Sequence, residues 1–266
     1  MSGIYEPKGK AREYSPLALN YYSGCSHGCL YCYVKPMMGR FRTDYNHNHV
    51  SIEQEKKLKE IEKSAKLYSG TNKQVLLSFT SDVYNEYDTE TKFTREVLEV
   101  LLKNRIPVSI LTKGGARCLR DIDIFKKYKD RIKVGATLTF DNDKDSISWE
   151  PGGALPKERI ETLKALHGEG IKTWVSFEPV ISTEQTIALA KKTLRFVDYY
   201  KIGKLNNYKG LDKGIDWSSF LSTMVGIMED NNKEYYIKKD LLAFNKTIRF
   251  EPKRMDQDYL TIGNFA

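Results

Sequence analysis

The chain has 266 residues, of which 40% are hydrophobic and 29% are charged, and this composition permits one large folded unit or two small ones. The sequence has no apolar stretch long enough to span a bilayer and no low-complexity tract, which argues against membrane-spanning, fibrous and disordered proteins. Its 43 Lys and Arg side chains outnumber its 35 Asp and Glu side chains, and the resulting net charge of +8 favours partners that carry phosphate.

Predicted strands and helices alternate along the chain. Short apolar, β-branched runs predict strands over residues 17–22, 75–79, 107–112, 132–140, 172–177 and 197–202. Helical periodicity predicts helices over residues 52–68, 93–103, 119–128, 157–167 and 184–194. This alternation is typical of a parallel sheet wrapped by helices.

We therefore predict an α/β fold, a partial (β/α)6 TIM-like barrel with parallel strands. The barrel is expected to cover residues 17–203. Residues 1–16 would form an N-terminal extension, and residues 204–266 a C-terminal extension that closes the barrel. Basic and aromatic residues interleave in the C-terminal extension, which would suit a phosphate backbone and exposed bases. A barrel-closing helix and strand with an ordinary basic rim is the preferred interpretation.

Three of the four cysteines stand in one short segment after the first predicted strand. Cys25, Cys29 and Cys32 form a CxxxCxxC pattern. Thiolates are soft ligands that suit iron, and three of them on one loop can each hold one iron of a four-iron cluster. The pattern predicts an iron-sulfur site whose fourth iron is open to a substrate or cofactor.

Zinc and disulfides are the alternatives for these cysteines. His27, His47 or His49 could complete a zinc site, but zinc knuckles usually pair CxxC units across a longer gap. Disulfides are disfavoured because the cysteines crowd into eight positions and the N-terminus has no apolar signal segment. The chain is therefore expected to be reduced and cytoplasmic.

Polar segments follow several predicted strands. In barrels of this kind, loops at the carboxyl ends of the strands converge on one cavity. Such segments occur at residues 78–82, 112–114, 137–139 and 177–179, and the cysteine segment falls at the same edge. We expect all five to surround a single site.

The cysteine segment, with Tyr31 directly before Cys32, resembles the signature of radical S-adenosylmethionine (SAM) enzymes. Its sequence resembles the spore photoproduct lyase-like branch more closely still. The resemblance implies a [4Fe-4S] cluster held by Cys25, Cys29 and Cys32. It also implies that S-adenosyl-L-methionine binds the open iron and is cleaved to a 5′-deoxyadenosyl radical, which abstracts hydrogen from a substrate. A reductant such as flavodoxin or ferredoxin would supply the electron.

The resemblance also implies residues that bind SAM. Lys113 would pair with the SAM carboxylate, Ser81 would lie near SAM, and Tyr31 would lie beside the adenine. Thr137 and Thr139 share one face of a strand and could bond the ribose hydroxyls. A solvated lysine and ordinary strand threonines are the alternatives.

One departure from the branch concerns the hydrogen donor. Spore photoproduct lyases carry a hydrogen-donating cysteine in a Cys-Thr-Ser-Asp segment, whereas the matching segment here begins with Phe79, which cannot donate. Cys118 does not match that position and is expected to be a buried structural thiol. Tyr31 and Tyr33 are therefore the candidate catalytic residues, as phenolic relays. Repair of thymine dimers by the cysteine route is not expected.

Three functions remain open from the sequence. The first is a radical SAM enzyme that acts on a base of DNA or RNA, extruded or single-stranded. The second keeps this chemistry for a small molecule or peptide, and the third is a metal-dependent nucleic-acid-binding module without catalysis. Glu150 and Glu178 could bind a substrate amine or hydroxyl, although holding loops through backbone hydrogen bonds is the preferred interpretation.

Overall fold

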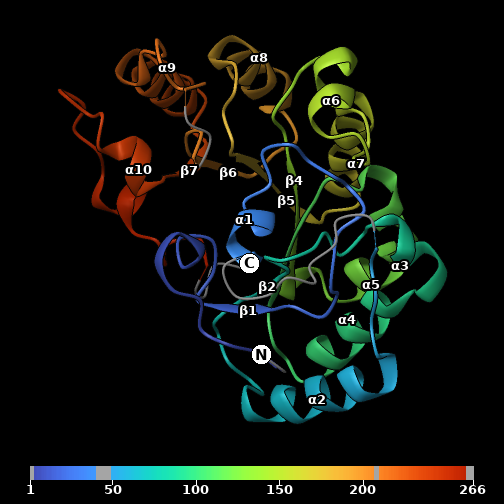
Figure 1. Cartoon of the computed structure of the whole chain (residues 1–266). Helices are drawn as coiled ribbons and strands as arrows, with labels where there is room; N and C mark the ends of the chain where they lie inside the picture. Colours follow the sequence, from blue (N-terminus) through green and yellow to red (C-terminus); the bar gives the residue numbers. More distant parts are fainter. Residues whose placement is uncertain (1–2, 40–48, 207–209, 262–266) are drawn as a thin grey trace.

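Seven parallel strands form one sheet in which each strand pairs with the next along the chain. The computed structural model describes residues 3–39, 49–206 and 210–261 (Figure 1). The strands are β1 (Leu17–Leu19), β2 (Val75–Leu77), β3 (Val108–Thr112), β4 (Ile132–Thr137), β5 (Lys172–Phe177), β6 (Tyr199–Ile202) and β7 (Glu234–Ile237). Parallel neighbours in chain order, joined by helical crossovers, give the curved sheet of a partial barrel.

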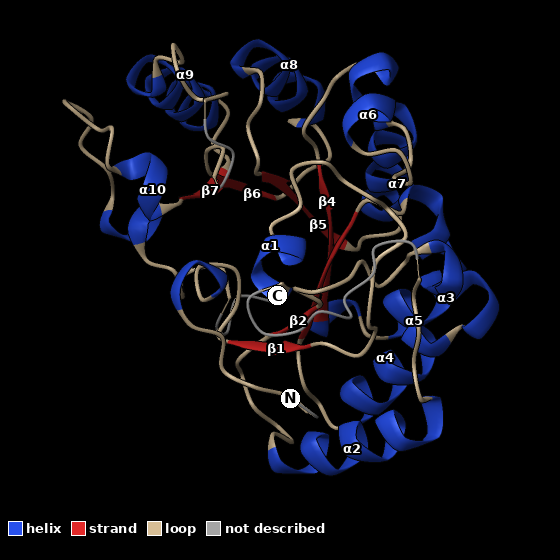
Figure 2. Cartoon of the chain, viewed as in Figure 1, coloured by secondary structure: helices blue, strands red, loops and turns tan. Residues whose placement is uncertain are grey.

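Helices connect the strands, and most of them cover the outer side of the sheet, whereas α1 lies inside the arc of strands in this view (Figure 2). The α-helices are α1 (Val34–Met38), α2 (Gln54–Leu67), α3 (Glu86–Thr91), α4 (Phe93–Lys103), α5 (Ile122–Lys127), α6 (Asp143–Trp149), α7 (Pro156–Gly168), α8 (Thr183–Thr193), α9 (Trp217–Asp230) and α10 (Lys239–Leu242). The 3-10 helices are η1 (Gly9–Ala11), η2 (Gly115–Asp121), η3 (Lys129–Arg131) and η4 (Pro252–Met255). Within the described ranges, no helix is both long and apolar enough to cross a membrane.

The predicted α/β fold with parallel strands is confirmed, and the sheet has one more strand than predicted. Strands β1, β2 and β4 end two or three residues before their predicted ends. After β1 and β2, a side chain takes the place of the backbone hydrogen bonds between the two strands. Asn20 Oδ1 accepts hydrogen bonds from Phe79 N and Ser78 Oγ, each at 2.8 Å. The chain leaves the sheet there to build the loops of the site. The domain boundaries stay predictions.

The N-terminal segment runs into the interior of the barrel. Lys201 Nζ, on β6, donates to the carbonyl oxygen of Tyr14 at 2.9 Å and also to that of Glu13. The Glu13 carboxylate accepts from Tyr236 Oη on β7 at 2.8 Å. These bonds place Tyr14 inside the barrel, at the carboxyl end of its strands.

Aromatic rings fill the barrel beneath this point. Trp174 on β5 stacks on Tyr199 on β6, with ring centroids 5.4 Å apart and planes 4° apart. Position 135 on β4 needs glycine, because a Cβ there would lie 2.5 Å from the Trp174 ring. Leu260 packs in the same cluster, and its carbonyl oxygen accepts from the buried Lys133 Nζ at 2.9 Å. The C-terminal segment therefore covers the end of the barrel that lies opposite the carboxyl ends of the strands.

Candidate active site

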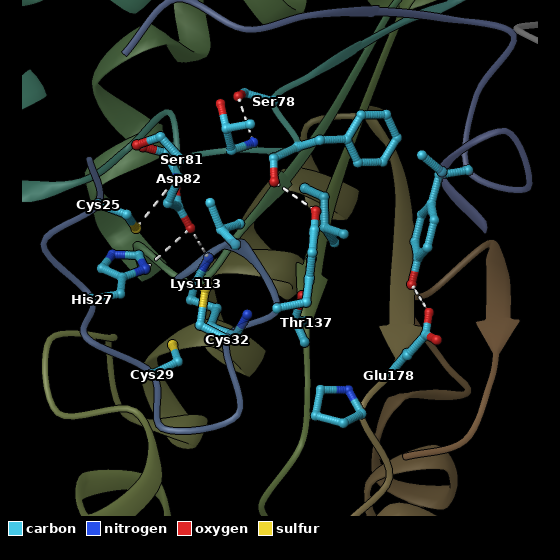
Figure 3. Close-up of a pocket in the computed structure, with 18 of the residues that line it drawn as sticks. Cys25, His27, Cys29, Cys32, Ser78, Ser81, Asp82, Lys113, Thr137 and Glu178 are labelled. Atoms are coloured by element: carbon cyan, nitrogen blue, oxygen red, sulfur yellow. Dashed lines mark hydrogen bonds and ion pairs between the residues drawn. The ribbon is translucent and has the colours of Figure 1, made fainter. Parts of the chain in front are cut away.

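A cavity of about 290 Å³ lies at the carboxyl ends of the strands (Figure 3). Loops after β1, β2, β3 and β5 all reach it, as predicted from the positions of the polar segments. Its lining includes eight of the predicted site residues, which are Cys25, Cys29, Tyr31, Cys32, Tyr33, Ser81, Lys113 and Thr137. Thr139, the ninth, does not line it. Parallel strands thus bring together side chains that lie far apart in the sequence.

The three cysteines lie in one loop, residues 25–33, which we call the cluster loop. All three are half-buried, and the backbone N–H of Asp82 points to Cys25 Sγ at 3.5 Å. Burial raises the pKa of Cys25, and that of Cys29 to about 12. A metal must therefore displace the thiol protons as it binds.

The donor set fits an iron-sulfur cluster. Within the described residues, no three Cys, His, Asp or Glu side chains meet closely enough to hold a single metal ion. The ligands of one zinc ion must all lie within about 2.3 Å of it, whereas three thiolates on separate irons of a cube stand farther apart. Of the histidines in the zinc alternative, His27 faces Asp82 through Nδ1 at 3.3 Å and His49 is exposed, while His47 lies outside the described residues.

The segment 149–153 clamps the cluster loop. The backbone N–H of Leu30 donates to Trp149 O, and that of Gly152 donates to His27 O, both at 2.9 Å. A Cβ on Gly152 would collide with Ser26 O and lie 2.8 Å from His27 Cα. Only glycine at this position lets the two backbones approach so closely.

Glu150 fixes Tyr31 inside this clamp. Tyr31 Oη donates to Glu150, Thr139 Oγ1 donates to Glu150 Oε1 at 3.1 Å, and Arg159 pairs with Glu150 Oε2 at 2.6 Å. Burial alone would raise the pKa of Glu150, but the charges of Arg159 and Lys113 bring this pKa below its ordinary value. Glu150 therefore holds its loop through side chains rather than through the predicted backbone bonds. The hydroxyl of Thr139 faces Glu150.

Asp82 joins the cluster loop to β3. Its carboxylate accepts from Thr112 Oγ1 at 2.7 Å, from Lys113 N at 2.6 Å and from Tyr84 N at 2.9 Å, and it lies 3.3 Å from His27 Nδ1. Burial lowers the pKa of His27 to about 4, so the imidazole is neutral at pH 7. This role of Asp82 depends on residues from three loops, which no local motif marks.

Lys113 brings positive charge to the cysteine side of the cavity. Its Nζ lies 5.5 Å from the centroid of the Tyr31 ring. Burial opposes the charged form, but Cys29 and Glu150 raise the pKa of Lys113 above its ordinary value. Among the side chains that the structure describes, no carboxylate forms an ion pair with Lys113. The ammonium is therefore available to an anionic ligand group.

Glu178 anchors the end of the cavity opposite the cysteines (Figure 3). It accepts from Tyr14 Oη at 2.6 Å and from Asn206 Nδ2 at 2.9 Å, and it pairs with Lys238. The preferred interpretation of Glu178 as a backbone acceptor is replaced by these side-chain bonds. Tyr14, Asn206 and Lys238 were missed because they lie outside the predicted barrel, and no local motif marks them.

Phe79 and Tyr33 form part of the wall between the two ends. Tyr33 Oη donates to the carbonyl oxygen of Phe79 at 2.6 Å, and the Phe79 ring meets the Tyr14 ring edge-on at 6.2 Å between centroids. Cys118 is fully buried and does not line the cavity, and burial raises its pKa to about 12. Its surroundings agree with a structural thiol.

Sequence comparison identifies relatives across most of the chain. The model of the radical SAM superfamily matches residues 19–197. An uncharacterized protein of Methanocaldococcus jannaschii is 29% identical over 189 residues, which cover 71% of this chain and 70% of that protein. An uncharacterized protein of Acidianus two-tailed virus is 25% identical over 186 residues, 68% of this chain and 61% of its own length.

Solved structures share the fold. Spore photoproduct lyase complexed with dinucleoside spore photoproduct superposes with a TM-score of 0.64 at 14% identity, covering 84% of this chain and 76% of the lyase. Streptococcus suis SuiB bound to S-adenosylmethionine superposes with a TM-score of 0.62 at 15% identity, covering 88% of this chain and 53% of SuiB. At these identities the likeness concerns the fold.

Proposed function

The chain belongs to the radical SAM superfamily, and we propose from this premise that it abstracts hydrogen from a base of DNA or RNA. As a member of this family it is an enzyme that uses a [4Fe-4S] cluster and S-adenosyl-L-methionine. When bound, this pair supplies a 5′-deoxyadenosyl radical once a reductant provides one electron. Flavodoxin or ferredoxin as that reductant, and the cytoplasm as the location, are parts of the proposal.

Residues on the cysteine side of the cavity would hold the cofactors. Cys25, Cys29 and Cys32 would bind three irons. Lys113 would pair with the SAM carboxylate, because it is a half-buried cation in the cavity with no carboxylate partner among the described residues.

Three further residues would complete the SAM pocket. Ser81 and Thr137 line the cavity and offer hydroxyls to SAM. Tyr31, held by Glu150, would form the wall beside the adenine. These roles rest on the predicted positions together with the geometry of the lining.

The observation that carries the proposed substrate is the hydrogen-bonding end of the same cavity. Glu178 lines that end, and Asn206 and Lys238, which line it too, donate to its carboxylate. Base edges also combine donors and acceptors, so such an end suits a polar ring better than an apolar substrate. The net charge of +8 and the dinucleoside held by the lyase of similar fold support the same proposal.

A small molecule or peptide is the second candidate substrate. Phe79 favours it in one respect, because this side chain cannot supply the hydrogen atom that the lyase cysteine donates. Tyr33 and Tyr31 stay the predicted relays, with Tyr33 the more exposed of the two at 43%.

An anaerobic assay separates the two candidates. The protein is loaded with iron and sulfide, mixed with SAM and dithionite, and 5′-deoxyadenosine is quantified by chromatography with and without single-stranded DNA, UV-irradiated DNA and RNA. We expect a polynucleotide to stimulate formation. Formation that none of the three changes would favour the small-molecule or peptide candidate, and a fully loaded protein that forms none would contradict the assignment of SAM cleavage.

A further inference from the structure

An aromatic ring lies exposed near the polar end of the cavity. Phe244 follows α10 and is 38% exposed. Its ring centroid lies 6.3 Å from that of the buried Trp217, and Lys204 Nζ lies 5.8 Å from the centroid of the Phe244 ring. These contacts hold the ring in place and leave part of it open. An aromatic ring held in this way offers a platform on which another flat ring can stack.

A series of contacts joins Phe244 to the cavity. The carbonyl oxygen of Lys204 accepts a hydrogen bond from Asn206 Nδ2 at 3.4 Å, and Asn206 lines the cavity. Lys10 lines the cavity too, donates to Asn206 Oδ1 at 3.1 Å and pairs with Asp240 on α10 at 2.5 Å. Helix α10 and the segment after it therefore border the polar end of the cavity, on the side of β7 (Figure 1).

Basic side chains accompany this ring in the sequence. Exposed Lys239 begins α10, and Lys246 and Arg249, which are exposed as well, follow the ring by two and five residues. The Asn245 side chain both donates to the backbone of residue 248 and accepts from it, each at 2.9 Å, so Lys246 stands in a fixed turn. We call Lys239, Phe244, Lys246 and Arg249 the α10 surface.

The three cations of this surface keep their charge free. Among the described residues, Lys239, Lys246 and Arg249 form no ion pair, and the acidic side chains next to them in the sequence, Asp240 and Glu251, pair with other lysines. An anionic partner can therefore approach all three cations without displacing a carboxylate.

From this arrangement we propose that the α10 surface binds a single strand of DNA or RNA beside the cavity, with phosphates on the three cations and one unpaired base stacked on Phe244. The inference deepens the proposed function and rests on it, because a strand held there would present a neighbouring base to the cavity. Bases in a duplex stack on one another and leave no free face, so the surface selects unpaired strands. It lies outside residues 19–197, which the superfamily model matches, and so belongs to the C-terminal segment of this chain.

Phe244→Leu tests the stacking, because leucine keeps the apolar bulk but has no aromatic face, and Phe244→Trp is the variant that retains such a face. Lys246→Gln combined with Arg249→Gln tests the phosphate contacts. Lys63→Gln combined with Lys66→Gln is the matched control, since both lysines are exposed on α2, away from α10 (Figure 1). Binding of the reconstituted protein to dye-labelled oligothymidine of about 12 nucleotides is followed by fluorescence anisotropy at several salt concentrations.

We expect Phe244→Leu to weaken single-strand binding by about fivefold to a hundredfold, and Phe244→Trp to stay within about twofold of the wild type. Binding of the same strand in a duplex with oligodeoxyadenosine should respond to neither variant. The double variant of Lys246 and Arg249 should reduce the slope of log affinity against log salt by about 1.4, while the α2 control keeps the wild-type slope.

Wild-type single-strand affinity in Phe244→Leu, or a wild-type salt slope in the double variant of Lys246 and Arg249, would overturn the α10 surface. The proposed function fails separately, if the fully loaded wild type forms no 5′-deoxyadenosine with SAM and dithionite.

Discussion

Substituting Gly152 by alanine should release the cluster loop from its clamp. The added Cβ would collide with Ser26 O and lie 2.8 Å from His27 Cα. Both are backbone atoms, so the loop itself must move, and overpacking of this kind costs about 1–3 kcal/mol. Movement also lengthens the 2.9 Å hydrogen bond from Gly152 N to His27 O, which adds about 0.5–1.5 kcal/mol. The unfolding free energy should therefore fall by roughly 2–4 kcal/mol.

Two measurements test this prediction: the thermal stability of the protein and its content of iron and sulfide. Thermal unfolding of the metal-free protein should give Gly152→Ala a Tm at least about 4 °C lower than the wild type. Iron and sulfide per chain after anaerobic reconstitution should fall as well, since two ligands flank the displaced residues. Gly226→Ala on α9 is the control, because a Cβ there meets nothing within 4 Å. Alanine in this helix should raise stability by up to about 1 kcal/mol.

A wild-type Tm together with full cluster content in Gly152→Ala would refute this reasoning. That result would mean that the loop accommodates the methyl group without moving its ligands. A lower Tm with full cluster content would limit the clamp to stability and exclude its role in holding the cluster.

Three further predictions concern charged side chains. Lys113→Met should weaken SAM binding by about tenfold to a hundredfold, the worth of a charge-assisted hydrogen bond, with iron content unchanged; equal affinity in anaerobic titration calorimetry would contradict this role. Glu150→Gln leaves Arg159 buried without its charge partner and should cost about 3–5 kcal/mol in urea unfolding, whereas the surface variant Glu161→Gln should cost almost nothing. Burial, aided by Lys172, lowers the pKa of Lys133 to about 7 in the fold, so the unfolded chain binds more protons above that pH. The unfolding free energy should therefore rise between about pH 7 and pH 10, by at most about 1.4 kcal/mol per pH unit, and Lys133→Met should flatten that rise in urea unfolding at several pH values.

The sequence by itself determined the helices and strands whose bounds depend on local apolar periodicity. The helix at residues 93–103 and the strand at residues 172–177 have the predicted bounds, because apolar periodicity over one element is set within that element. Strand ends were less accurate. Beyond β1 and β2, the Asn20 side chain accepts hydrogen bonds in place of a strand backbone. The apolar pattern of a strand does not predict such a side-chain contact. The preferred interpretation of the C-terminal extension, a helix and a strand that close the barrel, agrees with α9 and β7, although its basic and aromatic composition did not give their bounds.

The gathering of three cysteines at the cavity could be predicted because their spacing is local. Cys25, Cys29 and Cys32 occupy eight positions, so one loop brings the thiols together whatever the rest of the fold does. The strand-end segments at Ser81, Lys113 and Thr137 could be placed in one cavity for a similar reason, since parallel strands share one edge for their carboxyl ends.

Tertiary structure alone decided which side chains hold and complete the site. Tyr31 and Glu150 are 119 residues apart in the sequence, and Tyr14 and Glu178 are 164 apart. Such pairs form because β4 and β5 adjoin in the sheet, because segment 149–153 returns over the cluster loop, and because the N-terminal segment enters the barrel. A hydrogen bond acts over about 3 Å, and the separation of two side chains in space is set by the whole path of the chain between them.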